Sequence, residues 1–248
     1  MSRARFRGKS ARKTFPLVRW IYPSLGLALA VPAAGVWIGL ARLVRSLPFH
    51  GSVVYPAVAG GATYLLLHFL FRKPMTLYVF GHELTHAIAA LLSGYKVKSL
   101  FVSEKGGEVE LTDSNVFVAL APYCVPLYTG IVLLLYGLVK QYAALSSPPL
   151  WVGFFVGLTL SFHVALTVHS LRQNQPDLRH AGTLFSLVMI VLANGGAMAF
   201  VMKSLFPSSV NLATFFGEWG GDTRILFWRV WEGVGWVRGG AATLWGQK

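Results

Sequence analysis

The sequence is poor in acidic residues and contains a single cysteine. Nine aspartates and glutamates stand against 22 lysines and arginines among 248 residues, and charged residues make up only 12% of the chain. So low a share of charge excludes an ordinary soluble domain of this length. Cys124 cannot form an internal disulfide, and no histidine or carboxylate close in sequence could activate it as a nucleophile. The sequence also contains no internal repeat, P-loop or glycine-rich nucleotide fingerprint.

Hydrophobic residues, by contrast, make up 54% of the chain and gather in six apolar stretches. Most of these stretches are long enough to cross a hydrocarbon core of about 30 Å as a helix. The fold class that we predict is an all-α polytopic membrane protein with about six transmembrane or membrane-embedded helices. The predicted stretches are 20–40, 53–71, 75–92, 115–139, 151–171 and 181–202.

The first segment, 1–19, is rich in arginine and lysine and contains no acid. By the positive-inside rule it predicts a cytoplasmic N-terminal tail, and we expect an integral protein of a bacterial inner membrane. An organellar transit peptide has the same composition, which leaves an organelle as the alternative. The net charge of +13 is gathered at chain ends and segment borders, so anionic lipids rather than nucleic acid are the expected partner.

The last segment, 207–248, interleaves tryptophan with arginine and is rich in glycine. Both side chains suit the headgroup layer, so we predict an interfacial amphipathic segment that contacts anionic lipids rather than a seventh span. The alternative is a mobile tail with incidental aromatic residues. The predicted domain organisation is therefore a tail at 1–19, a membrane-embedded domain at 20–206 and this C-terminal segment.

Two local patterns interrupt the helical stretches. Residues 96–111 alternate with a period of two around Gly106 and Gly107, which predicts a small β-hairpin that leans on the helices. A solvated connector is the alternative for this segment. Pro122 and Pro126 interrupt the fourth apolar stretch, which predicts a broken helix whose freed backbone groups are satisfied inside the protein.

The strongest chemical motif is His-Glu-x-x-His, which lies in the stretch 75–92 at His82, Glu83 and His86. Residues four apart share one face of a helix, so the two imidazoles can point at one zinc ion. Glu83 lies beside them, close enough to take a proton from water activated by the metal without being a ligand. The alternative is a pair of buried structural histidines, but ionisable groups at membrane depth usually mark function.

A catalytic zinc usually has three protein ligands, so a third donor is required. Of the nine acidic residues, only Glu83 and Asp177 lie near the apolar stretches and outside the hairpin and the C-terminal segment. Asp177 follows Pro176, a residue type favoured in the first turn of a helix, so it could simply favour the dipole of the next helix. We predict Asp177 as the third ligand, with His180 as a supporting partner or substitute ligand.

The remaining histidines are better explained as structural residues. His163 and His169 are six apart and do not share a helix face, so we expect them to be packed or hydrogen-bonded. His68 lies in the second apolar stretch and His50 in a loop, and both are expected to be structural.

These residues resemble the site-2 protease family of intramembrane zinc metalloproteases. The resemblance covers 75–202 and depends on the segment from Gly81 to Ala87, the small residues that follow it, the hairpin and the late Asp177. It implies zinc bound by His82, His86 and Asp177, with Glu83 as general base.

Two features set the chain apart from many members of that family. The family's late motif commonly ends in Leu-Asp-Gly, whereas here Asp177 is followed by Leu178, so the chain looks closer to a compact branch. No segment between the hairpin and the fourth apolar stretch could hold a PDZ domain. Substrate selection would then fall to the hairpin, the loops or a membrane partner protein.

The function implied is hydrolysis of a peptide bond in or near a transmembrane segment of a membrane-protein substrate. The hairpin edge could hold the unwound substrate as an added strand, and Asn115 or Asn174 could donate to the developing oxyanion. The rival interpretation is a non-enzymatic membrane scaffold or a small ion or proton transporter that uses the same His and Glu cluster.

Overall fold

The computed structural model describes residues 16–245 except 48–50, 72, 105, 144, 146, 174 and 180, and it describes side chains from 20 to 233. Most of the predicted basic tail lies outside the described residues. The same holds for His50, for Asn174 and for His180, so the predictions for these three side chains stay predictions.

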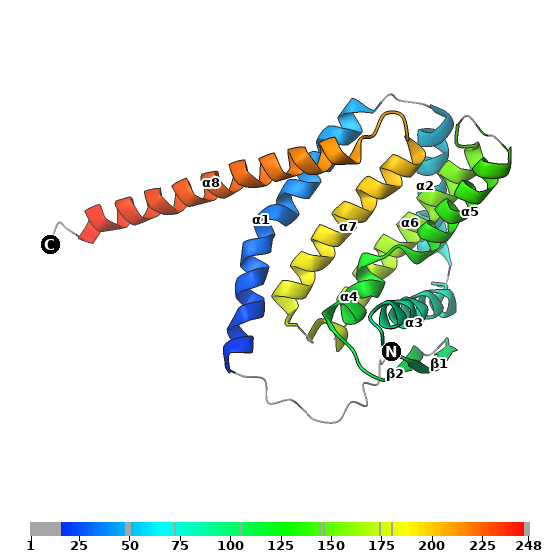
Figure 1. The fold of residues 1–248 in the computed structure, drawn as a ribbon, viewed down its shortest axis with the longest axis horizontal. Coiled ribbons are helices and arrows are strands. Elements are labelled where there is room, and N and C mark those ends of the chain that lie inside the picture. Colours follow the sequence, from blue (N-terminus) through cyan, green and yellow to red (C-terminus); the bar gives the residue numbers. More distant parts are fainter. Residues whose placement is uncertain are drawn as a thin grey trace.

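The structure confirms the predicted all-α membrane protein with one small hairpin (Figure 1). The elements in chain order are α1 (Pro16–Ser46), α2 (Gly51–Leu70), α3 (Met75–Leu92), β1 (Val97–Ser103), β2 (Gly106–Leu111), α4 (Val116–Cys124), α5 (Leu127–Ala143), α6 (Leu150–Leu171), the short 3-10 helix η1 (Asp177–Arg179), α7 (Thr183–Leu205) and α8 (Leu212–Trp245).

Four of these helices, α1, α2, α6 and α7, are long and apolar enough to cross a membrane. The pair α4 and α5 passes the same test together but bends by 72° at its break, as a broken span or a re-entrant segment would. Helix α3 is not among the candidate spans of the described residues. Figure 1 shows it lying across one end of the bundle, so neighbouring elements shelter this short helix.

The backbones of the candidate spanning helices α2 and α6 approach each other closely. A Cβ on Gly157 of α6 would lie 1.9 Å from the Ala57 carbonyl oxygen of α2, so only glycine permits this approach of two backbones. Helices α1 and α7 run in the same direction. The ring centroids of Tyr22 and Phe185 lie 5.3 Å apart near the start of both helices, and Val36 lies beside Gly195 further along both. The N-terminal end of α1 therefore lies at the same end of the bundle as η1.

The predicted break in the fourth apolar stretch lies between α4 and α5, at Val125 and Pro126. The helical partner of the Tyr123 carbonyl would be Leu127 N, but at this break Leu127 N donates to the Val125 carbonyl at 2.8 Å instead, so the Tyr123 carbonyl is left free. The Asn194 side chain of α7 donates to that carbonyl at 2.8 Å, and His163 of α6 contacts the same amide at 3.2 Å. The freed carbonyl is thus satisfied inside the protein, as predicted.

The hairpin is antiparallel and leans on α3, as predicted. Every second residue of β2 is buried, and Val109 and Leu111 pack with Ala90 of α3 and Val118 of α4. Gly106 has a φ of +145°, a conformation that the turn needs and that other residues rarely adopt. One face of the hairpin therefore belongs to the core beside α3.

The C-terminal segment forms one long helix, α8, which leaves the bundle (Figure 1). Its first part is fixed to α1, because Trp219 donates to the Pro32 carbonyl at 2.8 Å and Arg42 pairs with Asp222 at 2.8 Å. Beyond this part the large side chains are exposed, Trp228 and Trp231 among them. The placement of this segment at the membrane interface stays a prediction.

Candidate metal centre

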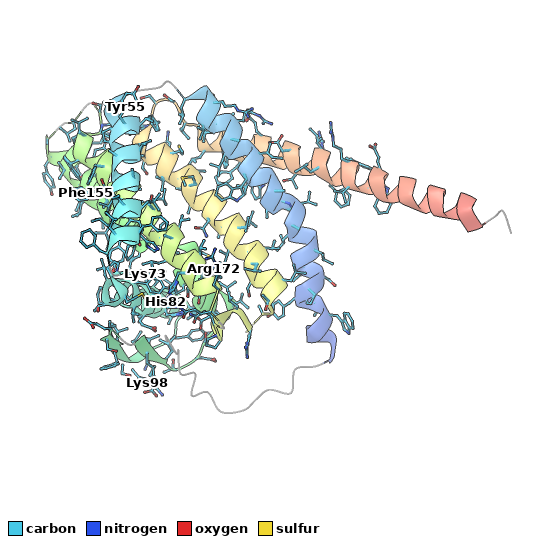
Figure 2. All side chains as sticks on the ribbon, turned by 180° about the vertical axis from the view of Figure 1, so that it is seen from behind. Tyr55, Lys73, His82, Lys98, Phe155 and Arg172 are labelled. Atoms are coloured by element: carbon cyan, nitrogen blue, oxygen red, sulfur yellow. The ribbon has the colours of Figure 1, made fainter. Side chains whose placement is uncertain are left out.

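Helix α3 presents its polar residues on the face turned toward the rest of the protein. His82, Glu83 and His86 are all buried there, although each is ionisable. The helix packs against α4 and both hairpin strands. Figure 2 shows His82 between Lys73, just before α3, and Lys98 on the hairpin. The chain thus encloses three polar side chains at the end of an apolar bundle.

Asp177 reaches this face of α3 from the segment between α6 and α7. Its Oδ2 atom lies 3.5 Å from His82 Nε2 and 3.5 Å from His86 Nε2. One ligand atom from each of the three residues lies within 4.8 Å of the others. Donors around a tetrahedral metal with bonds of about 2.0–2.1 Å stand roughly 3.4 Å apart. The separations therefore suit three ligands of one ion.

The three side chains carry atoms whose bonding is incomplete. His82 Nε2, His86 Nε2 and Asp177 Oδ1 are buried and have no hydrogen-bond partner among the described residues. Leaving a buried polar atom unsatisfied costs about 1–3 kcal/mol, so three such atoms at one point are expensive. A bound cation would satisfy them together. The residues present therefore fit a metal ion.

The second nitrogen of each imidazole has a partner that orients the ring. His86 Nδ1 donates to the Val118 carbonyl at 2.7 Å, and since a carbonyl only accepts, its Nε2 is left with the lone pair. His82 Nδ1 lies 3.4 Å from the Tyr78 hydroxyl. Both rings thus have a contact outside the metal centre that holds Nε2 toward Asp177.

Asp177 belongs to η1, which two neighbouring helices hold in place. The Tyr123 hydroxyl of α4 donates to Asp177 Oδ2 at 3.0 Å. Leu178 packs with Ile190 of α7, and Ser186 donates to the Leu178 carbonyl at 3.0 Å. Helix α7 begins only at Thr183, so the alternative that Asp177 serves the dipole in its first turn is wrong.

The pKa of the Asp177 carboxyl lies below its ordinary value. Burial alone would raise this pKa, but the imidazoles of His82 and His86 lower it by more. The carboxylate is therefore ionised at neutral pH, which is the form that binds a metal.

Glu83 is completely buried and follows His82 on α3. Strand β2 closes over it, because a Cβ on Gly107 would lie 2.8 Å from Glu83 Cγ and 2.5 Å from Val79 Cγ1. A glycine at this position lets the strand backbone pass against the glutamate. The hairpin thus determines where the Glu83 side chain can lie.

The other predicted polar residues have structural partners. Asn115 caps α4, since its side chain accepts from Val118 N at 2.8 Å and donates to Ser93 at 3.3 Å. Its amide oxygen serves the cap and its nitrogen donates to Ser93, while the prediction that Asn115 serves the oxyanion stays a prediction. His68, His163 and His169 are hydrogen-bonded to Tyr64, Asn194 and Lys73 respectively, as expected of structural residues.

The residues that support the ligands were not predicted from the sequence. Tyr78 precedes His82 by four positions, so helical spacing could have placed it on the same face. Tyr123 lies in the turn before a proline break that was expected to face the interior.

In a comparison with protein-family models, the chain matches the model described as Peptidase M50B-like over residues 55–216. The match covers well over half of the chain and includes the whole metal centre. Neither the curated proteins nor the solved structures contain a match.

Proposed function

Because the chain belongs to the Peptidase M50B-like family, we propose that it is an intramembrane zinc metalloprotease that cleaves a membrane protein in or near a transmembrane segment. One observation supports this most strongly. Two imidazole nitrogens and a carboxylate converge beside a buried glutamate at one end of a membrane bundle. The proposed ligands are His82, His86 and Asp177.

The donor set favours zinc over the harder cations. Two nitrogen ligands and one carboxylate with a further position for water are typical of catalytic zinc, whereas calcium and magnesium prefer oxygen ligands alone. When bound, such an ion supplies Lewis-acid polarisation of the scissile carbonyl and acidifies the attacking water.

Glu83 is the proposed general base. It would take the proton of the attacking water and deliver it to the leaving amine, because it is buried, directly follows His82 on α3 and is not needed as a ligand. Gly107 and Val79 confine its side chain, which limits the positions that the carboxylate can take. His82, His86 and Asp177 would meanwhile hold the ion that polarises the substrate carbonyl.

A substrate helix must unwind before its carbonyls can be attacked, because they are hydrogen-bonded within the helix. We propose that the hairpin holds the unwound segment as an added strand. Each strand of the two-stranded sheet has one edge that its partner strand does not occupy. Since β2 also closes over Glu83, a segment held at the hairpin would be close to the proposed base.

The N-terminal end of α1 supports a proposed orientation of the protein in the membrane. That end lies beside the start of α7 and hence at the same end of the bundle as η1. If the basic tail at 1–19 is cytoplasmic, the metal centre lies toward the cytoplasmic side. We propose a bacterial inner membrane as the site of action, with α8 and the basic tail on anionic lipids and a membrane partner as a candidate regulator.

The decisive experiment replaces Glu83 by glutamine in the full chain in detergent or vesicles. Removal of a general base lowers the rate by about 10²–10⁴-fold, while the metal ligands are untouched. We expect Glu83→Gln to retain one zinc ion per chain and to lose cleavage of a tagged single-span membrane protein that the wild type cuts. The exposed Glu218→Gln variant on α8 is the matched control and should cleave normally.

Two results would count against the proposal. Cleavage at the wild-type rate by Glu83→Gln would exclude its role as base. A purified wild type that holds no stoichiometric metal would instead favour the ion or proton relay, since a relay can use the same histidines without a resident ion.

A further inference from the structure

Three basic side chains lie where helices α2 and α6 end. The two helices run in the same direction, because Gly153 of α6 lies against Val53 of α2 and Gly157 lies against Ala57. Their C-terminal ends therefore lie at one end of the bundle, the end that also carries α3 (Figure 1). The chain leaves α2 here to begin α3, and it leaves α6 here toward the segment that carries Asp177.

Lys73 and His169 join these two parts of the chain. The Lys73 ammonium donates to His169 Nδ1 at 3.1 Å, since an ammonium has donors only. The side-chain amide of Gln173 lies 3.0 Å from the other ring nitrogen, so the imidazole is held on both sides. Arg172 is the C-cap of α6 and follows His169 by three positions, which places both on one helix face. Figure 2 shows Lys73 and Arg172 at this end of the bundle.

No acidic side chain neutralises this basic group. Among the residues that the structure describes, ion pairs join Arg42 and Lys98 to carboxylates, whereas none joins Lys73 or Arg172 to one. The Arg172 side chain is exposed, and that of Lys73 is half-buried. Lysine and arginine offer several donors and no acceptor, so both side chains retain donors that an anion can use.

The start of α3 adds to the positive charge. The helix begins directly after Lys73 and Pro74, and its first turn has no acidic residue and no side-chain cap. Since the N-terminal end of a helix carries a positive partial charge, Lys73 lies at the unfavourable end of α3. The C-terminal end of α6 favours Arg172 but does not account for Lys73. An anion bound here would offset the charge of Lys73 and of the helix end together.

The neighbouring apolar side chains favour a lipid headgroup as the source of this anion. Phe69, Leu70 and Phe71 come just before Lys73 and are exposed, Phe69 by 81%. Because α2 is a candidate span, these side chains are suited to contact acyl chains. Basic groups between the ends of such helices lie at headgroup level and bind anionic lipid headgroups. A free phosphate would use the basic side chains but none of the apolar ones.

We infer that Lys73 and Arg172, with His169 holding Lys73 in place, form a binding site for the phosphate of an anionic lipid such as phosphatidylglycerol. The bound phosphate would connect the start of α3 to the end of α6. Since α3 carries two of the proposed metal ligands and the chain after α6 carries the third, the lipid would hold the two parts of the metal centre together. The site itself lies outside the metal centre, and the inference does not depend on the proposed function.

The test titrates phosphatidylglycerol onto the full-length protein in a non-ionic detergent and counts bound lipids by native mass spectrometry, with zwitterionic phosphatidylcholine as the reference. We expect the wild type to bind one phosphatidylglycerol more tightly than phosphatidylcholine. Lys73→Gln and Arg172→Gln should each weaken this binding roughly fivefold, the effect expected of one basic residue beside an anionic lipid. His169→Leu removes the acceptor for Lys73 and should also weaken binding, whereas His169→Asn keeps an acceptor and should restore most of the affinity.

The matched controls are Lys140→Gln near the end of α5 and Arg45→Gln near the end of α1. Both remove one positive charge that has no ion-pair partner among the described residues. Both lie at the other end of the bundle, where α1 and α5 pack against the start of α2. We expect each control to bind phosphatidylglycerol like the wild type.

Unchanged phosphatidylglycerol binding in Lys73→Gln and Arg172→Gln would overturn the inference. Equal losses in the two controls would overturn it as well, because they would mean a general effect of net charge. Inorganic phosphate that displaces the lipid at the same concentration would exclude the lipid as the source of the anion. Displacement by a soluble acidic peptide, but not by inorganic phosphate, would overturn the inference in favour of an acidic protein partner. All these readouts are independent of proteolysis, so the protease proposal stands or fails separately.

Discussion

Because Gly107 of the hairpin lies against the proposed base Glu83, we expect Gly107→Ala to impair both stability and cleavage. The new Cβ would lie 2.5 Å from Val79 Cγ1, 2.8 Å from Glu83 Cγ and 3.0 Å from the Phe101 carbonyl oxygen. None of these atoms is the free end of a flexible side chain, since Val79 is buried and β-branched and Phe101 belongs to β1. Strand and helix must therefore move apart by a sizeable fraction of an ångström.

Two consequences can be measured for this variant. Overpacking of this kind costs about 1–3 kcal/mol, and each kcal/mol lowers the unfolding midpoint by roughly 2–4 °C in a chain of this size. A misplacement of about 1 Å can reduce catalysis on the order of 100-fold. We expect cleavage to fall far more than zinc affinity, because the new Cβ at position 107 would press on Glu83 and not on the metal ligands.

The assay compares thermal unfolding, zinc affinity and cleavage in the same preparation. Gly130→Ala is the matched control, because nothing lies within 4 Å of its new Cβ. Wild-type cleavage and an unchanged midpoint in Gly107→Ala would refute the claim that β2 positions Glu83. A loss of zinc equal to the loss of cleavage would refute it as well, because the damage would then lie at the ligands.

Two further predictions concern the packing of helices away from the metal centre. Gly157→Ala would place its Cβ 1.9 Å from a backbone oxygen of α2 and should cost about 1–3 kcal/mol, whereas Gly137→Ala meets nothing within 4 Å and should be neutral or stabilising in thermal unfolding. Equal midpoints would contradict the tight packing of α2 on α6. The pair of Arg42 and Asp222 between α1 and α8, in which the Arg42 side chain is 49% exposed and that of Asp222 is 12% exposed, should show a coupling of about 0.2–1 kcal/mol in a double-mutant cycle, decreasing at high salt. A coupling energy that does not change with salt would contradict the expectation that solvent ions screen this ion pair.

Much of the fold could be predicted because local patterns decide it. The apolar stretches, the period-two segment and the two prolines each act over a few residues, and the helices, the hairpin and the break between α4 and α5 lie where they were expected. Helix α1 reaches Ser46, beyond the predicted end at residue 40, because its last turns pack on α7 and α8 despite Arg42 and Arg45. Burial against neighbours outweighs the polar side chains there.

The metal centre could be predicted only in part. The spacing of His82 and His86 is a property of one helix, so the sequence shows it directly. Asp177 was predicted by eliminating the other acidic residues. Its position next to the histidines depends on a 3-10 turn that no local sequence pattern predicted. The capping role of Asn115 was not predicted, because a cap and an oxyanion donor look alike in sequence, and only the distance to Val118 N reveals the cap.

The supporting residues also indicate where in the membrane the chemistry takes place. Tyr78 lies in the first turn of α3, Tyr123 at the end of α4 and Asp177 between α6 and α7, and α3 itself lies across one end of the bundle, so these polar groups gather at that end. Water can reach helix ends without crossing an apolar interior, and hydrolysis requires water at the metal centre. We therefore expect the scissile bond near one end of the substrate's transmembrane segment, on the side that carries the hairpin. Cleavage products mapped by mass spectrometry to the middle of that segment would contradict this placement.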